Sequence, residues 1–522
     1  MRVSSGWSPR LAAGTATTSE RLVSALAEDI LDGVVAEGER LPPHRALAEQ
    51  LGVALGTVTK AYAELFGERT VRRQALAEQL GVALGTVTKA YAELGLRGLV
   101  RGTHGRGTFV SYRAEQPASS IDLAMNMPPR MLSDDVIAEA LAASAHRVDA
   151  EVLSACGPPG GRLEYRRSAA AWIAASGLDL APEDLVLAHG AQQGIAAVLM
   201  ALSSGAPGGR PVPVFTEEVT FHGALSYARL AGHRLHGVPV DRQGMRPDLL
   251  DRRLHEHARA GGPRPVVYVT PTLQNPTAAT MCASRRRELV RVARLHDVFI
   301  IEDDVYALSE ERSAPALVSL APERTFHVSS ASKALSPAIR VGMIKPPCAF
   351  RPRIAEAVRA LGLPVSPLIC VLLDELVSAG IATTVRASIR DEGARRIALA
   401  RDVLGPALFV APASGYHVYL PMAPERARSV ARSADAAGVL VTDPDSMLAD
   451  LQQRVGGVRL SLGAPTMADL ARGLSAMRDV LGTASAGATT DDTGRRLSPT
   501  PWPGSDRRPA PVGSAGADLL GR

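Results

Sequence analysis

Between residues 121 and 481, short apolar runs alternate with stretches of helical amphipathic spacing, and this alternation restricts the possible folds more than any other feature of the chain. Alternating strands and helices are typical of α/β domains, in which helices cover a mostly parallel sheet. We therefore predict one α/β domain over residues 121–482. Its predicted strands are 185–188, 212–216, 266–270, 298–301, 325–329 and 341–344.

Residues that can do chemistry follow four of these strands, and open α/β sheets bind ligands at the carboxyl ends of their strands. After the first strand, Gly190 makes a close turn, and the amides of Ala191 and Gln192 open a helix. The positive end of a helix is suited to bind a phosphate group. The residues that follow the other three strands are Asn275, then Asp303 with Tyr306, and then Lys333.

The stretch SSASKALSPAIRVG (329–342) surrounds Lys333 with Ser330, Ser332 and Arg340. A lysine that forms a Schiff base must be partly desolvated and near an anion-binding group. Small hydroxyls and an arginine are what the phosphate of pyridoxal phosphate requires. Most lysines lie on solvated surfaces, so this stretch alone does not indicate a cofactor site. The interpretation depends on the other parts of such a site that appear elsewhere in the chain.

The amino-terminal part, residues 19–110, has a different pattern. Helical spacing over 19–34 precedes two short helices around a glycine turn in 38–65, which is helix-turn-helix spacing. The segments 98–101 and 107–110 flank a Gly/His/Arg tip and predict a β-hairpin wing. Residues 95–113 contain four arginines and no acid, which suits contact with DNA phosphates. A small helical protein-binding domain is the alternative.

The sequence ALAEQLGVALGTVTKAYAEL occurs twice without a substitution, at 46–65 and at 75–94. Such identity indicates a recent duplication of the coding segment, not a mature repeat architecture. One folded domain can use only one of the two helix pairs to read DNA. The first copy keeps the preceding LPPHR segment, whereas the second keeps the contiguous path into the wing, and we favour the second.

The amino-terminal unit resembles the winged helix-turn-helix of the GntR family through LPPHRALAEQLGV, GTVTKAYAEL and GLVRGTHGRGTFV. One departure concerns Ala54-Leu55 and Ala83-Leu84, which stand where the family has a polar pair. They remove the cap of the recognition helix, worth about 1 kcal/mol. The resemblance implies DNA contacts from Arg45, Thr57, Thr59, Lys60 and Tyr62 or their second-copy equivalents Thr86, Thr88, Lys89 and Tyr91, and from Arg106 and Gly107 at the wing.

The larger domain resembles the fold-type I pyridoxal phosphate enzymes of aminotransferase class I/II, whose motifs occur here in the family's order. The resemblance implies a mixed, mostly parallel sheet and a smaller C-terminal α+β subdomain. Lys333 would form the Schiff base, and Asp303 would pair with the pyridine nitrogen. The other implied contacts are Asn275 and Tyr306 at the phenolic oxygen, Ser330, Arg340, Ala191 and Gln192 at the phosphate, Phe221 stacked on the ring, and Arg459 at a substrate carboxylate.

Each of these residues also has a simpler explanation when it is taken alone. Asp303 would be a solvated acid at a strand end, Phe221 a core residue, Arg459 part of a structural ion pair and Asn275 a turn residue. Their joint occurrence in the family's order favours the cofactor site. Two departures, Cys156 where relatives have tyrosine and Ala278 where they have glycine, are expected to weaken phosphate binding.

The fusion of the two units resembles the MocR subfamily of transcriptional regulators. It implies a homodimer that binds double-stranded DNA and senses pyridoxal phosphate or an amino-acid-like effector. The alternative is a pyridoxal phosphate-dependent aminotransferase with a degenerate DNA-binding domain, and a third, weaker hypothesis is that the duplication leaves a non-functional product. Residues 111–120 form a polar linker that spans at most roughly 35 Å.

Composition excludes several other classes of protein. The chain has 522 residues and a net charge of +5, which permits a nucleic-acid partner without implying one. Its four cysteines form no CxxC pair, so we expect neither a disulfide framework nor a metal site. No apolar run reaches about 18 residues and no secretion signal is evident, so we expect a cytoplasmic protein without a membrane segment. Residues 1–18 and 483–522 are expected to be disordered.

Overall fold

The computed structural model describes residues 100–103, 107–110, 120–154, 157–307, 312–362 and 364–486. The expected hairpin is present within this part: β1 (Val100–Thr103) pairs antiparallel with β2 (Gly107–Val110), which contains the predicted wing residue Gly107. The two duplicated segments, the predicted DNA contacts from Arg45 to Tyr91, Arg106, Cys156 and the terminal segments 1–18 and 487–522 lie outside the described residues.

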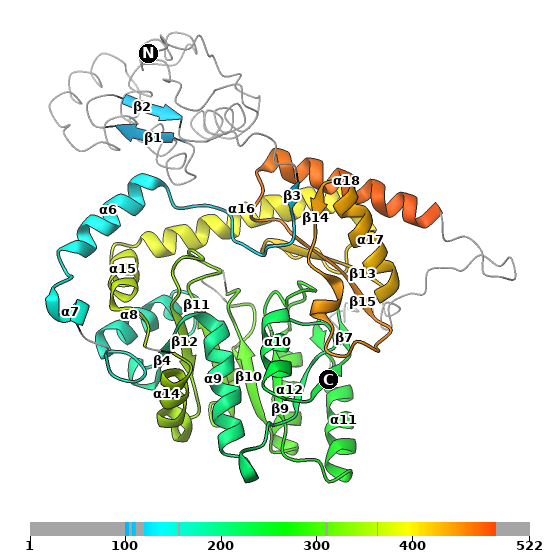
Figure 1. Ribbon diagram of the computed structural model, residues 1–522, viewed down its shortest axis with the longest axis horizontal. Helices are drawn as coiled ribbons and strands as arrows, with labels where there is room; N and C mark the ends of the chain where they lie inside the picture. The colour runs from blue at the N-terminus through cyan, green and yellow to red at the C-terminus, as the bar shows by residue number, and fades with distance from the viewer. Residues whose placement is uncertain are drawn as a thin grey trace, which may run out of the picture.

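A mixed sheet of seven strands forms the centre of the large domain, in the order β4-β12-β11-β10-β9-β5-β6 (Figure 1). All of its strand pairs are parallel except those made by β12, which is antiparallel to both of its neighbours. The sheet therefore has the mixed, mostly parallel character that we expected. The strands are β4 (Val186–Ala188), β5 (Val214–Glu217), β6 (Leu235–Val238), β9 (Val266–Val269), β10 (Phe299–Asp303), β11 (Thr325–Ser330) and β12 (Gly342–Lys345).

Burial on both faces explains why most of these strands can be found from the sequence. Strands β4, β5, β9, β11 and β12 are buried along their whole length. β4 and β9 consist of apolar and aromatic residues, whereas the other three also contain buried polar residues such as Glu217, His327 and Lys345. All six predicted strands are present. The seventh strand, β6, was not predicted because it is an edge strand whose first two residues, Leu235 and His236, are only half-buried.

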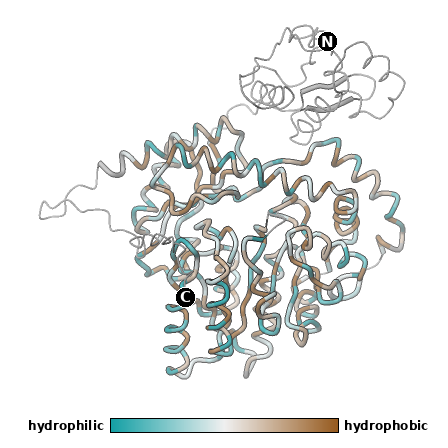
Figure 2. The backbone as a smooth tube through the Cα atoms, turned by 180° about the vertical axis from the view of Figure 1, so that it is seen from behind, coloured by the Kyte–Doolittle hydropathy of each residue, from teal (hydrophilic) through white to brown (hydrophobic). Residues whose placement is uncertain are grey.

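Helices cover both faces of the sheet and produce three layers. On one face, α9, α10 and α14 pack against residues such as Val328 and Ile344. On the other face, α11, α12 and α13 cover one half of the sheet and α8 and α15 cover the other half. Hydrophobic residues concentrate along the central strands (Figure 2). These helices are α8 (Leu163–Ala174), α9 (Gly190–Ser204), α10 (His222–Leu230), α11 (Pro247–Arg259), α12 (Ala283–Leu295), α13 (Leu317–Leu320), α14 (Arg351–Ala360) and α15 (Pro367–Ser378).

The C-terminal residues form a smaller α+β subdomain with its own apolar core. Its antiparallel pair joins β13 (His417–Met422) to β15 (Gly456–Ser461), and β14 (Val439–Leu440) pairs in parallel with β3 (Ile121–Asp122). The chain thus enters the large domain through a strand that belongs to the C-terminal subdomain. The helices of this part are α16 (Ile381–Leu404), α17 (Pro424–Ala436) and α18 (Met467–Ala486), and α18 extends beyond residue 482, where we placed the end of the domain.

The remaining elements are short or lie at the periphery. They are α6 (Asp134–Ala145), α7 (Ala150–Ser154), the hairpin β7 (Val240–Asp241) and β8 (Gly244–Met245), and 3₁₀ turns at 182–184, 207–209, 348–350, 405–407 and 444–447. Within the described ranges, no single helix is long and apolar enough to cross a membrane. The consecutive helices 367–378 and 381–407, bent by 79° at their junction, meet that test by length and composition when taken together.

Candidate cofactor site

Lys333 lies in the turn after β11, where it is partly buried. Its Nζ donates a hydrogen bond to the backbone oxygen of Asn126 at 2.5 Å, and the hydroxyl of Tyr416 donates to the backbone oxygen of Lys333 at 2.8 Å. Burial, together with the nearby cations Arg459 and Arg340, lowers the pKa of Lys333 to about 8. A large fraction of this amine is therefore neutral at mildly alkaline pH, as a nucleophilic lysine requires.

Asp303 ends β10 and is buried, with 3% of its surface exposed. Its Oδ2 accepts a hydrogen bond from the hydroxyl of Tyr268 at 2.7 Å. Its Oδ1 has no hydrogen-bond partner among the described residues. Burial raises the pKa of Asp303 to about 6, and the neighbouring Asp304 adds to the shift. A buried carboxylate with one free oxygen is suited to accept a hydrogen bond from a cationic ring nitrogen.

The third part of the site is a buried polar network around the hydroxyl of Tyr306. This oxygen accepts hydrogen bonds from Nδ2 of Asn126 at 2.8 Å and from Nδ2 of Asn275 at 3.4 Å. Asn275 in turn accepts a hydrogen bond from Nη1 of Arg459 at 2.8 Å through its Oδ1. Burial raises the pKa of Tyr306 to about 12, so its hydroxyl keeps its proton and can donate to an anionic oxygen.

Arg459 in β15 is 1% exposed, and no carboxylate neutralises it at hydrogen-bonding distance within the described residues. Its Nη2 donates to the backbone oxygen of Ala124 at 2.6 Å and to Oγ1 of Thr442 at 2.7 Å. The Nε of Arg459 is also buried and has no hydrogen-bond partner among the described residues. This geometry does not support a structural ion pair. A buried guanidinium with a free N–H instead suits an incoming carboxylate.

An anion-binding corner forms where α9 begins. Gly190 has φ +76°, and a Cβ there would lie 2.7 Å from Nη2 of Arg340, so the close approach of the guanidinium requires glycine. Arg340 donates hydrogen bonds to Oγ of Ser332 and to the backbone oxygen of His189, both at 3.4 Å. The first amides of a helix have no intrahelical acceptor, so those of Ala191 and Gln192 are available to an anion.

Phe221 immediately precedes α10, next to this corner. Nε2 of Gln192 donates to the backbone oxygen of Gly223 at 2.7 Å, which ties the start of α9 to the start of α10. A Cβ on Gly223 would lie 2.5 Å from the ring of Phe221, so the ring packs closely over the backbone there. Phe221 is half-buried, as an aromatic side chain at the edge of a ligand site would be.

The tertiary structure adds several residues to the predicted site. Asn126 comes from a segment before the first predicted strand, and Tyr416 comes from the C-terminal subdomain, so no local pattern points to either. Tyr268 lies inside a predicted strand. A phenol within an otherwise aliphatic buried run requires a polar partner, and this signal would have identified it. The other residues added are His417 and Thr442. Nδ1 of His417 lies 3.5 Å from Nδ2 of Asn126, and its Nε2 lies 3.1 Å from the backbone oxygen of Gln274. Thr442 accepts a hydrogen bond from Arg459.

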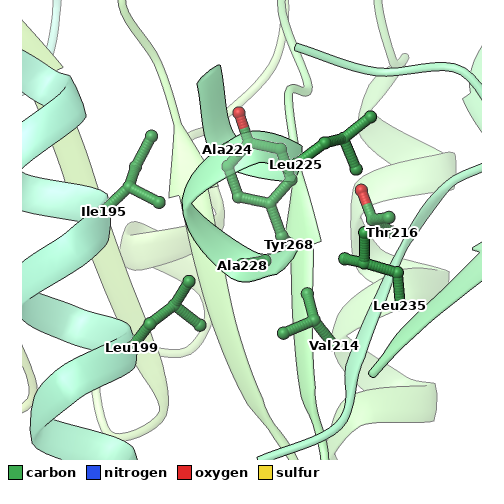
Figure 3. A pocket seen from close by; sticks show the side chains of 9 residues that line it. All are labelled: Ile195, Leu199, Val214, Thr216, Ala224, Leu225, Ala228, Leu235 and Tyr268. Atoms are coloured by element: carbon green, nitrogen blue, oxygen red, sulfur yellow. The ribbon is translucent and has the colours of Figure 1, made fainter. Parts of the chain in front are cut away.

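An apolar pocket lies elsewhere, between α9, α10 and strands β5, β6 and β9 (Figure 3). Its lining is aliphatic apart from Thr216 and Tyr268, and the hydroxyl of Tyr268 is bonded to Asp303. The pocket contains none of the residues predicted for the site. We interpret it as a packing gap between the sheet and its helices.

The residues present fit pyridoxal phosphate. The free Oδ1 of Asp303 offers an acceptor for the ring nitrogen, and the corner at Gly190 offers amides and Arg340 for a phosphate. Asn275 and Tyr306 lie together as donors for the phenolic oxygen. Lys333 is the partly buried amine among them, with a lowered pKa. Four chemically different requirements of one cofactor are thus met by groups that lie at or after the ends of separate strands.

Comparison with known proteins identifies the family of the large domain. Residues 118–477 match the family model described as aminotransferase class I and II, which covers more than half of the chain. The chain therefore belongs to the aminotransferase class I and II family, whose members typically bind pyridoxal phosphate. Residues 18–75 match the model of bacterial regulatory proteins of the gntR family, a span that contains the first duplicated copy and ends where the second begins.

The chain thus fuses a GntR-type helix-turn-helix to an aminotransferase domain, the arrangement of MocR-like regulators. It is 25% identical to the uncharacterized HTH-type transcriptional regulator YdeF of Bacillus subtilis, over 91% of this chain and 96% of that one. It is also 25% identical to the HTH-type pyridoxine biosynthesis transcriptional regulator PdxR of Corynebacterium glutamicum, over 72% and 76%. A solved α-aminoadipate aminotransferase, LysN of Thermus thermophilus, has the same fold: the TM-score is 0.60 at 24% identity, covering 71% of this chain and 94% of that one.

Proposed function

We propose that this chain is a DNA-binding transcriptional regulator that senses pyridoxal phosphate, or an amino-acid-like effector, through its aminotransferase domain. The observation that carries the proposal is the convergence of Lys333, Asp303 and Arg459 in one buried site of a chain that also contains a GntR-type segment. The end-to-end match to an HTH-type regulator, over 96% of that protein, supports it. PdxR, a related regulator, is named for pyridoxine biosynthesis.

The proposed roles of the site residues follow from their surroundings. The cofactor supplies an aldehyde and a ring that withdraws electrons when its nitrogen is protonated. Lys333 provides the amine, and Asp303 holds a proton at the ring nitrogen through its free oxygen. Arg459 directs a carboxylate toward Lys333. Ser330, Ala191, Gln192 and Arg340 hold the phosphate, and Phe221 covers the ring.

On the DNA side, we propose that residues 19–110 form the reader and that a homodimer sets the spacing of the two half-sites. The contacts come from one of the two duplicated copies, with Arg45 before the first copy and Arg106 and Gly107 at the wing. An effector changes DNA affinity only by the difference between its affinities for the two arrangements of the protein. Binding of the cofactor and binding of DNA are therefore expected to influence each other reciprocally.

DNA-binding anisotropy tests the proposal directly. The probe is a duplex from the region upstream of the protein's own gene, at fixed salt because phosphate contacts make affinity depend steeply on ionic strength. We expect specific binding whose affinity changes with pyridoxal phosphate. In Lys333→Ala the visible absorbance of the bound cofactor and the change in DNA affinity should both disappear while the fold remains. An unchanged response in that variant would eliminate the sensor function.

A second candidate function is an aminotransferase with a degenerate reader. The retention of Arg459 with its free buried N–H favours this alternative, because a substrate carboxylate would bind there. The chain is also 28% identical to the 2-aminoadipate transaminase of Thermus thermophilus over 56% of its length and 72% of that enzyme. Sustained multiple-turnover conversion of an amino acid and a keto acid would support it, whereas a single half-reaction would not.

A further inference from the structure

The segment Asp122–Met127, which we call the strap, is the first part of the large domain after the linker at 111–120. It runs from β3 toward α6, between the C-terminal subdomain and the loops at the carboxyl ends of the sheet (Figure 1). No motif in the sequence marks it. The chain runs from the wing through the linker into the strap, so the strap is the part of the large domain nearest in sequence to the DNA-binding unit.

One side of the strap contacts the cofactor site through Asn126. The backbone oxygen of Asn126 accepts the hydrogen bond from Nζ of Lys333, and its side chain donates the hydrogen bond to the hydroxyl of Tyr306. Asn126 is only 8% exposed, and its Oδ1 has no partner within the described residues. Buried polar atoms normally have a hydrogen-bond partner, so the unpaired Oδ1 of Asn126 is available to a donor that enters the site.

The other side of the strap is held by the C-terminal subdomain. The backbone amide of Leu123 donates to the oxygen of Leu440 at 2.9 Å, and the amide of Ser461 donates to the oxygen of Leu123 at 2.8 Å. The backbone oxygen of Ala124 accepts from Nη2 of Arg459 at 2.6 Å and from Oγ1 of Thr442 at 2.8 Å. The strap therefore bridges the two subdomains at the residues that ligands would engage.

Both expected ligand contacts compete with the strap. A lysine amine that held a carbonyl compound would keep at most one of its three N–H donors, so the cofactor would compete with the bond from Lys333 to the backbone oxygen of Asn126. A carboxylate that binds Arg459 in a two-point geometry takes the N–H that now serves Ala124. Loading with the cofactor thus removes one polar contact of Asn126, and a carboxylate effector removes one of Ala124, which keeps its bond from Thr442.

We propose that the strap reports the state of the cofactor site to the DNA-binding unit, and that Asn126 is the positioning residue through which it does so. This inference rests on the regulator function proposed above and adds its route of coupling. In the cofactor-free protein Lys333 and Arg459 hold the strap in place. In the loaded protein these two contacts no longer hold the strap, which is the segment that directly follows the linker.

Hydrogen–deuterium exchange of the full-length protein tests the release itself. The comparison is between protein freed of cofactor and the same protein with pyridoxal phosphate, whose binding is verified by absorbance. We expect faster exchange in the peptide that contains residues 121–127 on loading. In Lys333→Ala, exchange of this peptide should already be fast and should not respond to the cofactor. Unchanged or slower exchange in loaded wild type would overturn the proposal.

DNA anisotropy with and without pyridoxal phosphate tests the coupling, using the upstream duplex described above. Asn126→Ala removes the bond to Tyr306, and we expect the ratio of the two DNA affinities to move toward one by about fivefold, the contribution of one buried hydrogen bond. The matched control is Met125→Ala, because Met125 lies on the same strap with 54% of its surface exposed. A purely structural role for Asn126 would weaken both affinities equally, leave the ratio unchanged and refute the coupling.

The two proposals fail in distinguishable ways. If wild-type DNA affinity does not respond to the cofactor, regulation by the cofactor is refuted, and the proposed output of the strap is refuted with it. If DNA affinity responds while exchange of the strap does not change on loading, the strap alone is refuted. A response that is equal in wild type and Asn126→Ala also refutes the strap and leaves the regulator function intact.

Discussion

The pKa of Lys333 gives a prediction that can be worked through quantitatively. An ordinary lysine has a pKa of 10.5, whereas burial and the nearby cations Arg459 and Arg340 lower that of Lys333 to about 8. Only the neutral amine attacks an aldehyde. The rate at which cofactor-free protein takes up pyridoxal phosphate should therefore follow the neutral fraction of this one amine.

The lowered pKa has a large effect on the rate near neutral pH. At pH 7 roughly one tenth of an amine of pKa about 8 is neutral, against roughly one in 3,000 for an ordinary lysine, a ratio of about 300. Because the neutral fraction rises with pH until the pKa is passed, the loading rate should increase about tenfold per pH unit below pH 7 and level off above about pH 8.

The assay is stopped-flow absorbance of the bound cofactor between pH 6 and about 10. The chain has lysines only at 60, 89, 333 and 345, so reduction with borohydride followed by peptide mass spectrometry shows which one has reacted. Lys345→Arg is the matched control, because Lys345 is a buried lysine at the far end of β12 and should leave the profile unchanged. A rate that still rises steeply above pH 9 would refute our account of the environment of Lys333.

Three further predictions follow from the site and the core. Gly190→Ala should weaken binding of pyridoxal phosphate at least about tenfold in a fluorescence titration, because the added Cβ meets the guanidinium of Arg340 and the positive φ disfavours alanine; wild-type affinity would contradict the phosphate corner. Tyr268→Phe removes the donor to Asp303, whose pKa burial raises to about 6, so the pH below which cofactor affinity falls should move upward by about one unit. An unshifted profile in this variant would show that the hydroxyl does not stabilise the carboxylate. Burial raises the pKa of Glu217 to about 8 from 4.5, so the folded state holds a proton that the unfolded chain releases, and stability is lost as pH rises from about 5 to 8. Glu217→Gln should remove up to a few kcal/mol of the change in unfolding free energy between these pH values, so the melting temperature should depend less on pH than in wild type. If calorimetry shows the same dependence of melting temperature on pH in both proteins, Glu217 is not its source.

Much of the large domain could be predicted because its strands are buried on both faces and therefore rich in apolar residues. The positions of Asn275, Asp303 and Lys333 were predictable for a related reason: Asp303 is the last residue of β10, and Asn275 and Lys333 come after the carboxyl ends of β9 and β11. The edge strand β6 was not predicted, since its first two residues, Leu235 and His236, are half-buried and its apolar pattern is short. The boundary near residue 482 was set too early because α18 extends to Ala486 through small residues that resemble a linker.

The alternatives for single residues could be decided only by their surroundings. Taken alone, Asp303 is more simply a solvated acid, yet it is 3% exposed with one free oxygen. Arg459 is more simply part of an ion pair, yet its described partners are Asn275, Thr442 and a backbone oxygen. Burial and partner identity depend on chain segments far away in sequence, so no local pattern carries them.

The sequence by itself determined the class of fold, the order of the site residues and the presence of a GntR-type unit, because strand periodicity, strand ends and motifs are local properties of the chain. The tertiary structure alone decided that Asn126 contacts Lys333 from 207 positions away and that Arg459 donates to Ala124 from 335 positions away. These contacts arise where the strap passes between two subdomains. Such long-range contacts depend on how the two subdomains pack against each other. The periodicity of residues within either subdomain does not encode that packing.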